Sequence, residues 1–362
     1  MEFFASCAPG FEELLFGELC DLGLLKPRVL AGPPDEAGGV AFAGDEAALA
    51  RACRRLTLAE RVYLRYGPFP AADLQALERA AAKVPWRRFF PFESKLAVRA
   101  RTRRSRLDRD KTIAEKTAKA AGAALTPFDD ASPVPLVRVS LDGDKAVFDV
   151  DASGAPLHRR GWRLESAKAP LRESLAAGLL RASGWDARSP LIDPFCGAGT
   201  IAIEAALRAA GLPPSPGRSF AFEKWTGFAV PPEPAAAAGQ APRILASDRD
   251  EGAVRAAKAN AERAGVAGLI EFSVRAVSAL DSPPGPGWIV TNPPYGVRVS
   301  EGKELRVLYS ALGDALRSQC GGWRAALLAP PGPLVSATGL RVKPVLATLN
   351  GQLPVRVWSG RV

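Results

Sequence analysis

The sequence predicts an α/β protein whose carboxy-terminal half is a mostly parallel sheet covered by helices. Leu191 and Ile192 end a short apolar strand, and the alanine-rich run 201–207 begins a helix just after a glycine turn. Residues 288–291 form a second apolar strand that also runs into a turn. Strand and helix patterns alternate through this half, as is typical of βα units in a parallel sheet.

The length of 362 residues exceeds a typical domain and predicts two or three of them. At the amino terminus, residues 2–5 and 39–42 have short strand patterns. Phe11, Leu15 and Leu19 recur at helical spacing between these strands. The first part of the chain is therefore predicted to be a small α/β unit.

The stretch 83–119 carries almost all of the excess positive charge. It holds 13 basic and 4 acidic residues, a net +9 out of +10 for the whole chain. Such clustering is the electrostatic footprint of a surface that binds nucleic-acid phosphates, and the alternative is a solvated charged face. Thr112 and Glu115 are spaced for a capping box, which would place Lys116 and Lys119 on a helix.

A hairpin is predicted next, from strand patterns at 136–140 and 146–150 around the turn at Asp142. The connector that follows is rich in glycine and arginine, and we interpret it as a linker, an RNA contact or both. It contains His158, the one histidine of the chain, which we expect to be structural. A single histidine argues against a histidine-based triad or metal centre.

Two more features complete the expected carboxy-terminal half. A helix pattern spans residues 251–264, and either Asp248 or Asp250 can cap its start. Strand patterns at 341–345 and 355–358 predict that the chain ends in a strand pair.

The first candidate binding turn is 193–200, with the sequence Asp-Pro-Phe-Cys-Gly-Ala-Gly-Thr. Its two glycines allow a tight turn and a close approach of a ligand, and the following helix start favours hydrogen-bond acceptors. The pattern also fits a dinucleotide fingerprint, which expects a carboxylate about 20 residues later for the ribose. Here Asp248, the carboxylate at the next strand end, lies 49 residues past Gly199. Ribose binding by Asp248 remains an expectation, whereas the choice of cofactor stays open, and a turn without ligand is the alternative.

The second candidate is 292–296, with the sequence Asn-Pro-Pro-Tyr-Gly. Pro293 and Pro294 fix the backbone and remove two donors, so that the nearby carbonyls stay free to accept hydrogen bonds. Asn292 adds an amide oxygen and Tyr295 an aromatic face. Together these groups can hold a planar exocyclic amine by its hydrogens while the Tyr295 ring stacks on the ring that carries the amine. A plain strand-ending turn explains the prolines but not the whole set.

Cysteine usage and hydropathy exclude several classes of protein. The cysteines are odd in number and lack metal-ligand spacing, which predicts a reducing, cytoplasmic setting and no metal site. Cys196 lies in the glycine turn rather than beside Asn292, so we interpret it as a packing residue and not as a nucleophile. The sequence shows neither a signal-peptide pattern nor an apolar run of about 18 residues, so we expect no membrane partner. The cysteines are Cys7, Cys20, Cys53, Cys196 and Cys320.

The two turns resemble motifs I and IV of S-adenosylmethionine-dependent amino-methyltransferases. The surrounding segments 169–177, 218–225 and 308–313, together with Asn350-Gly351, resemble the THUMP-containing RNA guanine-N2 methyltransferases. The similarity is greatest to the bacterial 23S ribosomal RNA guanine-N2 methyltransferases and runs nearly end to end.

This resemblance implies a ferredoxin-like domain at 1–68, a THUMP RNA-binding domain at 69–152, a linker at 153–168 and a Rossmann-like methyltransferase domain at 169–362. It implies S-adenosyl-L-methionine as the cofactor and guanine N2 in 23S ribosomal RNA as the methylated group. The partner would be this RNA or the assembling large ribosomal subunit, with transfer RNA as the alternative, and we expect a monomer.

The resemblance also assigns site residues. Catalysis would fall to Asn292, Pro293, Pro294 and Tyr295. The cofactor would be bound by Pro170, Asp193, Phe195, Cys196, Gly197, Ala198, Gly199, Thr200, Glu204, Asp248 and Asn292. RNA would be bound by Arg99, Arg101, Arg103, Arg104, Arg106, Lys111, Lys116, Arg159 and Arg160. One departure concerns the cofactor adenine: where the family usually has an acidic residue, this chain has Ala276.

Four other functions remain open at this point. Adenine N6 or a guanine of transfer RNA fits the same motifs. A protein glutamine methyltransferase also uses an Asn-Pro-Pro-Tyr turn, but the basic amino-terminal half argues against it. A non-enzymatic RNA-binding protein is favoured only by Ala276.

Overall fold

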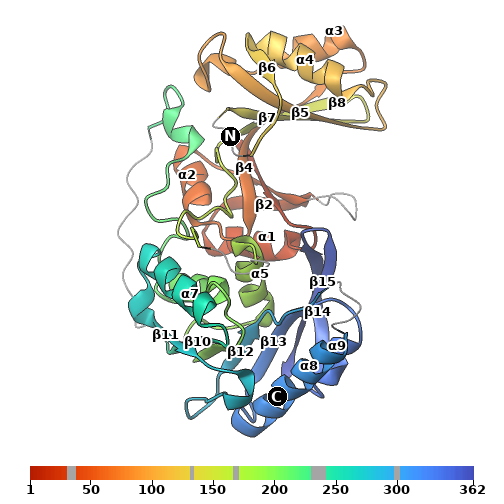
Figure 1. The fold of residues 1–362 in the computed structure, drawn as a ribbon. Coiled ribbons are helices and arrows are strands. Elements are labelled where there is room, and N and C mark those ends of the chain that lie inside the picture. The colour runs from red at the N-terminus through yellow and green to blue at the C-terminus, as the bar shows by residue number, and fades with distance from the viewer. Residues whose placement is uncertain (31–37, 131–133, 166–170, 230–241, 297–301) are drawn as a thin grey trace.

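The computed structural model describes residues 1–30, 38–130, 134–165, 171–229, 242–296 and 302–362. In this part of the chain, an eight-stranded sheet forms the amino-terminal half and a seven-stranded sheet the carboxy-terminal half (Figure 1). Helices pack on both sheets, which confirms the predicted mixed α/β fold.

The eight-stranded sheet has the order β2-β3-β1-β4-β8-β7-β5-β6. Most of its neighbouring strands are antiparallel, but β5 pairs in parallel with both β6 and β7. Its strands are β1 (Glu2–Cys7), β2 (Leu25–Leu30), β3 (Gly39–Ala43), β4 (Ala59–Pro70), β5 (Lys95–Arg103), β6 (Ala124–Thr126), β7 (Leu136–Asp142) and β8 (Lys145–Asp151).

Strand β4 joins two regions that we expected to be separate. It runs across the expected boundary between residues 68 and 69, and it pairs with β1 on one side and with β8 on the other. The ferredoxin-like and THUMP divisions therefore share one continuous sheet, and their boundary stays a proposal.

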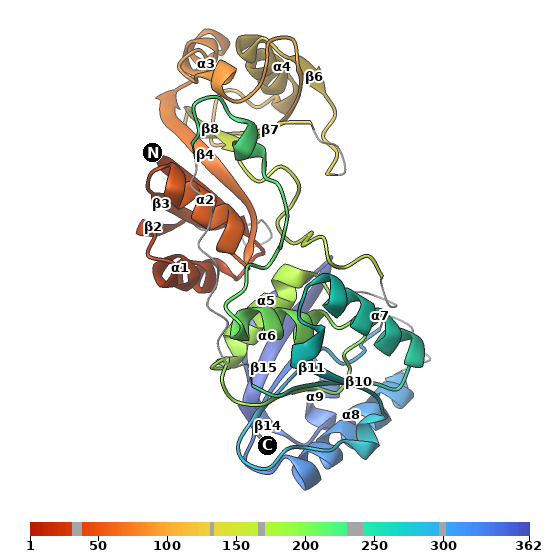
Figure 2. The same ribbon diagram turned by 90° about the vertical axis from the view of Figure 1, so that its left-hand side faces the viewer.

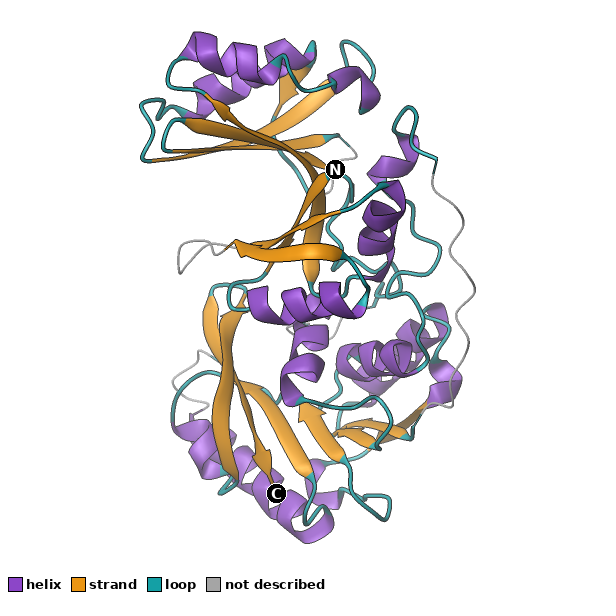
Figure 3. Cartoon of the chain, turned by 180° about the vertical axis from the view of Figure 1, so that it is seen from behind, coloured by secondary structure: helices purple, strands orange, loops and turns teal. Residues whose placement is uncertain are grey.

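The helices of this half lie on one face of the sheet. They are α1 (Glu12–Asp21), α2 (Glu46–Arg55), α3 (Leu74–Ala81) and α4 (Asp110–Ala121). Alternation along β4 explains the arrangement: Val62 and Leu64 enter the core beneath the helices, whereas Arg61 and Arg65 lie on the opposite face. Figure 3 shows that this opposite face carries no helix in the described part of the chain. We call it the helix-free face.

Two local predictions in this half have different outcomes. The β7–β8 hairpin is confirmed, and Gly143 (φ 56°) and Asp144 (φ 59°) form its tight turn. The capping box is wrong, because α4 begins at Asp110 and Thr112 already lies inside it. The helix itself is confirmed, and it carries Lys116 and Lys119 as expected.

The seven-stranded sheet has the order β11-β10-β9-β12-β13-β15-β14. The first five strands in this order are mutually parallel, and β15 runs antiparallel between β13 and β14. This is the mostly parallel sheet with a terminal strand pair that the sequence predicts. Its strands are β9 (Leu191–Asp193), β10 (Ile244–Asp248), β11 (Ile270–Val274), β12 (Trp288–Thr291), β13 (Arg324–Ala329), β14 (Arg341–Asn350) and β15 (Leu353–Arg361).

Helices cover both faces of this second sheet. They are α5 (Glu173–Ser183), α6 (Thr200–Ala209), α7 (Glu251–Arg263), α8 (Gly302–Gln319) and α9 (Pro333–Ala337). Val290 packs into the core with α5 and α6, whereas its neighbour Ile289 packs with α8 on the other side. Since both faces are buried, only the edge formed by the strand ends remains to hold a ligand.

The two halves are packed together along α5 and along the connector (Figure 2). The ring of Phe11 lies 2.2 Å from where a side chain on Gly178 would begin, so α5 has a glycine at this contact. In the connector, Leu157 and Trp162 are buried. Arg218 donates hydrogen bonds to the connector carbonyls of Pro156, Arg159, Ser153 and Ala155. The described connector residues are therefore packed and not a free linker.

Candidate cofactor and acceptor-base site

The two predicted turns meet at one edge of the seven-stranded sheet. Strands β9 and β12 are parallel neighbours, so both end at this edge and their turns lie side by side. Thr291, the last residue of β12, donates a hydrogen bond from its Oγ1 to Asp193 Oδ1 over 2.6 Å. Groups that are 98 residues apart in the sequence thus form one site.

The glycine turn is held against the end of β10. Gly197 donates its N–H to Asp248 Oδ2 over 3.0 Å, and Cys196 donates its N–H to the Ser247 carbonyl over 2.9 Å. A side chain on Gly199 would lie 2.9 Å from the Ala257 Cβ of α7 and would need a φ of +84°. Close packing and a left-handed backbone therefore both require glycine at this position.

Asn260 is a supporting residue that the sequence analysis did not identify. It is fully buried in α7 and donates from Nδ2 to the carbonyls of Ala198 (3.1 Å) and Glu165 (3.0 Å). It therefore ties the glycine turn to α7 and the connector. Nothing in its local sequence distinguishes it from a surface asparagine, because its partners lie far away along the chain.

Asp193 carries an unusual carboxyl group. Its side chain is 1% exposed, Oδ1 accepts from Thr291 and from the Phe195 N–H, and Oδ2 is buried without a partner in the described part of the chain. Burial raises its pKa to about 7, and Asp248 adds to the rise. A buried acceptor oxygen without a partner suits a ligand that brings a hydrogen-bond donor or a positive charge.

The second turn provides a similar acceptor and an aromatic ring. Asn292 Oδ1 is buried and also lacks a partner among the described residues. Pro293 is buried and Pro294 is exposed. Tyr295 is half-buried, and its Oη accepts a hydrogen bond from Asn350 Nδ2 over 2.9 Å. Burial raises the pKa of Tyr295, so the phenol stays protonated at neutral pH.

These groups fit a cofactor that has an ammonium group at one end and a ribose near the other. Asp193 Oδ2 and Asn292 Oδ1 are acceptors without partners, and the Asp248 carboxylate lies beside the same glycine turn. Ala276 is exposed just after β11, next to Arg275, whose N–H bonds the Asp248 carbonyl over 2.9 Å. Burial raises the pKa of Cys196 well above its usual range, which supports its interpretation as a packing residue.

Two predicted site residues are not where we expected them. Arg160 is 1% exposed and donates to Glu204 Oε1 (3.1 Å) and to the carbonyls of Leu157 and Thr57. The guanidinium is enclosed by the protein, which argues against the predicted contact with RNA. Glu204 is the partner in this ion pair and faces the amino-terminal half, so its assignment to the cofactor stays a prediction that this ion pair does not support. Pro170 lies outside the described residues.

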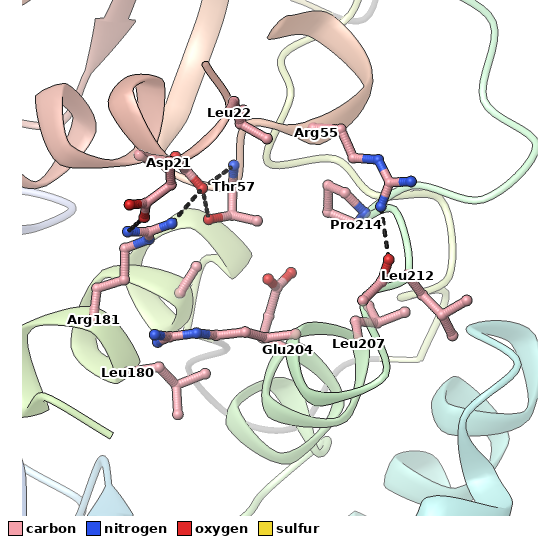
Figure 4. Close-up of a pocket in the computed structure, with 14 residues that line it drawn as sticks. Asp21, Leu22, Arg55, Thr57, Leu180, Arg181, Glu204, Leu207, Leu212 and Pro214 are labelled. Atoms are coloured by element: carbon pink, nitrogen blue, oxygen red, sulfur yellow. Dashed lines mark hydrogen bonds and ion pairs between the residues drawn. The ribbon is translucent and has the colours of Figure 1, made fainter. Parts of the chain in front are cut away.

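Glu204 instead lines a cavity of about 170 Å³ between the two halves (Figure 4). Arg55, Arg181 and Leu207 line it as well, and Arg55 donates to the Gly211 carbonyl at its rim. No residue of either motif turn contacts this cavity in the described structure. We therefore do not place the cofactor there.

Most of the predicted RNA-binding residues are exposed, both on β5 and beside it. Alternation places Leu96 and Val98 beneath the helices and leaves Arg99, Arg101 and Arg103 exposed on the helix-free face. Three other predicted RNA-binding residues have ion-pair partners: Arg104 pairs with Asp142 (2.8 Å), Arg106 with Asp144 (3.4 Å) and Lys116 with Glu78 (2.7 Å). Lys111 and Arg159 are exposed.

Other arginines on the helix-free face have structural roles. Arg65 and Arg138 both pair with the fully buried Asp149, over 2.8 Å and 2.6 Å, and both lie over the ring of Phe4. The middle of the face is thus closed by its own side chains, and the β5 end keeps its charges exposed.

Among the described residues, no group of three or more histidine, cysteine, aspartate or glutamate side chains is arranged to hold a metal ion. None of the described helices is long and apolar enough to span a membrane.

Strand order, glycine turn and strand-end carboxylate define a Rossmann-like domain of the methyltransferase class. A family model of the RMKL-like methyltransferase domain matches residues 160–355, and a model of the RlmL ferredoxin-like domain matches residues 2–63. The chain belongs to the family of the RMKL-like methyltransferase domain.

Individual relatives agree with this assignment. The ribosomal RNA large subunit methyltransferase K/L of Syntrophotalea carbinolica is 35% identical over 99% of this chain and 53% of its own length. The chain thus spans about half the length of the curated relatives it matches. A proposed methyltransferase complexed with SAH is 26% identical, with a TM-score of 0.82 over 100% of this chain and 98% of that one. A possible methylase of Clostridium difficile is 27% identical, with a TM-score of 0.81 over 99% and 97%.

Proposed function

We propose that this protein is an S-adenosylmethionine-dependent methyltransferase that acts on guanine N2 of 23S ribosomal RNA. The observation that carries the proposal is the pair of buried acceptors, Asp193 Oδ2 and Asn292 Oδ1, at one sheet edge without partners among the described residues. Asp193 Oδ2 suits the amino group of the cofactor, and Asn292 Oδ1 suits the exocyclic amine of a base.

The proposed chemistry is direct methyl transfer to nitrogen. S-adenosylmethionine supplies an electrophilic sulfonium methyl group, so the protein mainly has to align donor and acceptor. The Asn292 oxygen and a carbonyl near Pro293 accept hydrogen bonds from the amine and draw its lone pair out of conjugation with the ring. These bonds strengthen as the nitrogen becomes tetrahedral, which favours the transition state over the ground state. The proton leaves after transfer, so no strong general base is needed.

The base must leave its stack to reach this edge, at a cost of a few kcal/mol that stacking on Tyr295 partly offsets. The exposed arginines of β5 would bind RNA phosphates on the helix-free face. The region 69–152 would then be the THUMP RNA-binding domain that follows a ferredoxin-like domain at 1–68.

The name of the Syntrophotalea relative supports ribosomal RNA as the substrate. The five cysteines are free, which supports a reducing, cytoplasmic setting. We further propose that the protein acts as a monomer. A second candidate acceptor is adenine N6, because a structural relative of 27% identity from Listeria monocytogenes is described as a predicted N6-adenine-specific DNA methylase.

The test has two arms. Mass spectrometry of 23S and transfer RNA from a deletion strain should show the loss of one N2-methylguanine from 23S RNA. Purified wild-type protein with radiolabelled S-adenosylmethionine should restore that mark, and the Asn292→Ala variant should not. Loss of N6-methyladenine instead would favour the second candidate, and unchanged RNA in the deletion strain would reject both.

A further inference from the structure

The β14–β15 hairpin extends past the edge where the parallel strands end. Strand β15 pairs with β13 only as far as Arg356, whereas β14 and β15 continue to pair up to Asn350 and Leu353. The tip of the hairpin therefore stands beside the acceptor turn. Gly351, with a φ of +64°, makes the reversal at the tip.

Asn350 is the residue of this tip that reaches the acceptor turn. Its Nδ2 donates to Tyr295 Oη over 2.9 Å, which joins residues 55 positions apart. The hydrogen bond holds the Tyr295 ring at the end opposite its Cβ. Leu346 and Leu353 of the hairpin pack against the same apolar core as the ring.

The amino-terminal half braces the hairpin from the other side. A side chain on Gly10 would begin 2.1 Å from the Ala347 carbonyl oxygen, so the turn between β1 and α1 lies directly on β14. This contact is three residues before Asn350. The hairpin is thus supported close to its tip by the amino-terminal half, and at its tip by the acceptor turn.

We propose that Asn350 is a positioning residue, which sets the orientation of the Tyr295 ring for stacking on the acceptor base. The inference rests on the proposed function, because it needs a base at Tyr295. A phenol ring can rotate about χ1 and χ2, and a hydrogen bond at its far end removes most of that freedom before the base arrives. The gain is one of preorganisation, so it appears in the rate on RNA and not in cofactor binding.

A double-mutant cycle tests the proposal on the full chain. Asn350→Leu and Tyr295→Phe each remove one partner of the same hydrogen bond. Each should lower kcat/KM for RNA by about three- to tenfold, the effect of one net hydrogen bond. The double variant should be no worse than the poorer single variant, within about twofold. The affinity for S-adenosylmethionine and the melting temperature should stay near those of the wild type.

Gln352→Leu is the matched control, because it makes the same amide-to-leucine exchange at an exposed position of the same tip. Its kcat/KM should equal that of the wild type. Multiplicative losses in the double variant, or an equal loss in the Gln352 control, would overturn the role of Asn350 while the wild type still methylates RNA. Absence of methylation by the wild type would instead reject the proposed function, and the inference with it.

Discussion

The two sheets of this protein use their surfaces in opposite ways. The eight-stranded sheet has helices on one face and leaves Arg99 and Arg103 exposed on the other. The seven-stranded sheet is covered on both faces, and its polar groups gather at the edge where β9, β10 and β12 end. A broad charged face suits a long, shape-recognised ligand, whereas a strand-end edge can place single atoms. The difference teaches that the two proposed tasks, RNA binding and methyl transfer, have separable structural bases.

The largest effect expected from this comparison is at the edge. Asn292→Ala should lower kcat by on the order of a hundredfold or more, as loss of a transition-state contact does. The affinity for S-adenosylmethionine, measured by calorimetry, should stay near normal, because the glycine turn and Asp248 remain intact. A comparable loss of cofactor binding and turnover would contradict the assignment of Asn292 to the acceptor base.

A second test concerns the glycine turn at the same edge. Gly199→Ala meets Ala257 Cβ at 2.9 Å and also demands a left-handed backbone. Gly265→Ala demands the same backbone, with φ at +72°, but meets nothing within 4 Å. We expect cofactor affinity to fall about tenfold or more in the Gly199 variant and to stay unchanged in the Gly265 control, because close packing adds about 1–3 kcal/mol. Equal effects in both variants would mean that backbone strain alone matters.

The helix-free face has its own test in the salt dependence of RNA binding. The logarithm of the RNA association constant should fall linearly with the logarithm of salt concentration. Replacing Arg99 and Arg103 by glutamate should make this fall less steep, by about 1.4–1.8 in slope, because two phosphate contacts are lost. The matched control reverses Arg79 and Lys119, which are exposed on α3 and α4 behind the sheet. Its slope should stay close to that of the wild type. Similar slopes in the two double variants would show that RNA does not bind to the helix-free face.

The smallest expected effect is on the pH dependence of stability, measured as the melting temperature of the protein without cofactor. The pKa of Asp193 rises from 3.8 to about 7 on folding, so the folded protein holds this proton more tightly than the unfolded chain. Its contribution to stability is therefore complete below about pH 4 and is lost as the pH rises towards 7. The melting temperature of the wild type should therefore fall as the pH rises from about 4 to 7. In the Asp193→Asn variant this fall should be smaller by a few degrees. Asp151 and Glu204, whose pKa values burial also raises, stay in both proteins, so an unchanged slope would contradict the role of Asp193.

The sequence by itself determined several elements in each half and the two motif turns. The glycines of the first turn and the prolines of the second are local features, because backbone conformation depends on the residue itself. The apolar pattern of 191–192 and 288–291 likewise predicts buried strands wherever they pair. Once β5 is recognised as a strand, the alternation of its residues also places its arginines on one face.

Only the tertiary structure decided which polar residues serve the site and which serve the fold. Arg160 and Arg99 are indistinguishable as sequence positions, but Arg160 is enclosed with Glu204 while Arg99 is exposed. Asn260 and Asn350 acquire roles through partners 62 and 55 residues away. The physical reason is that hydrogen bonds and burial depend on distance in space. The sequence spacing of two residues carries that distance only within one helix, strand or turn.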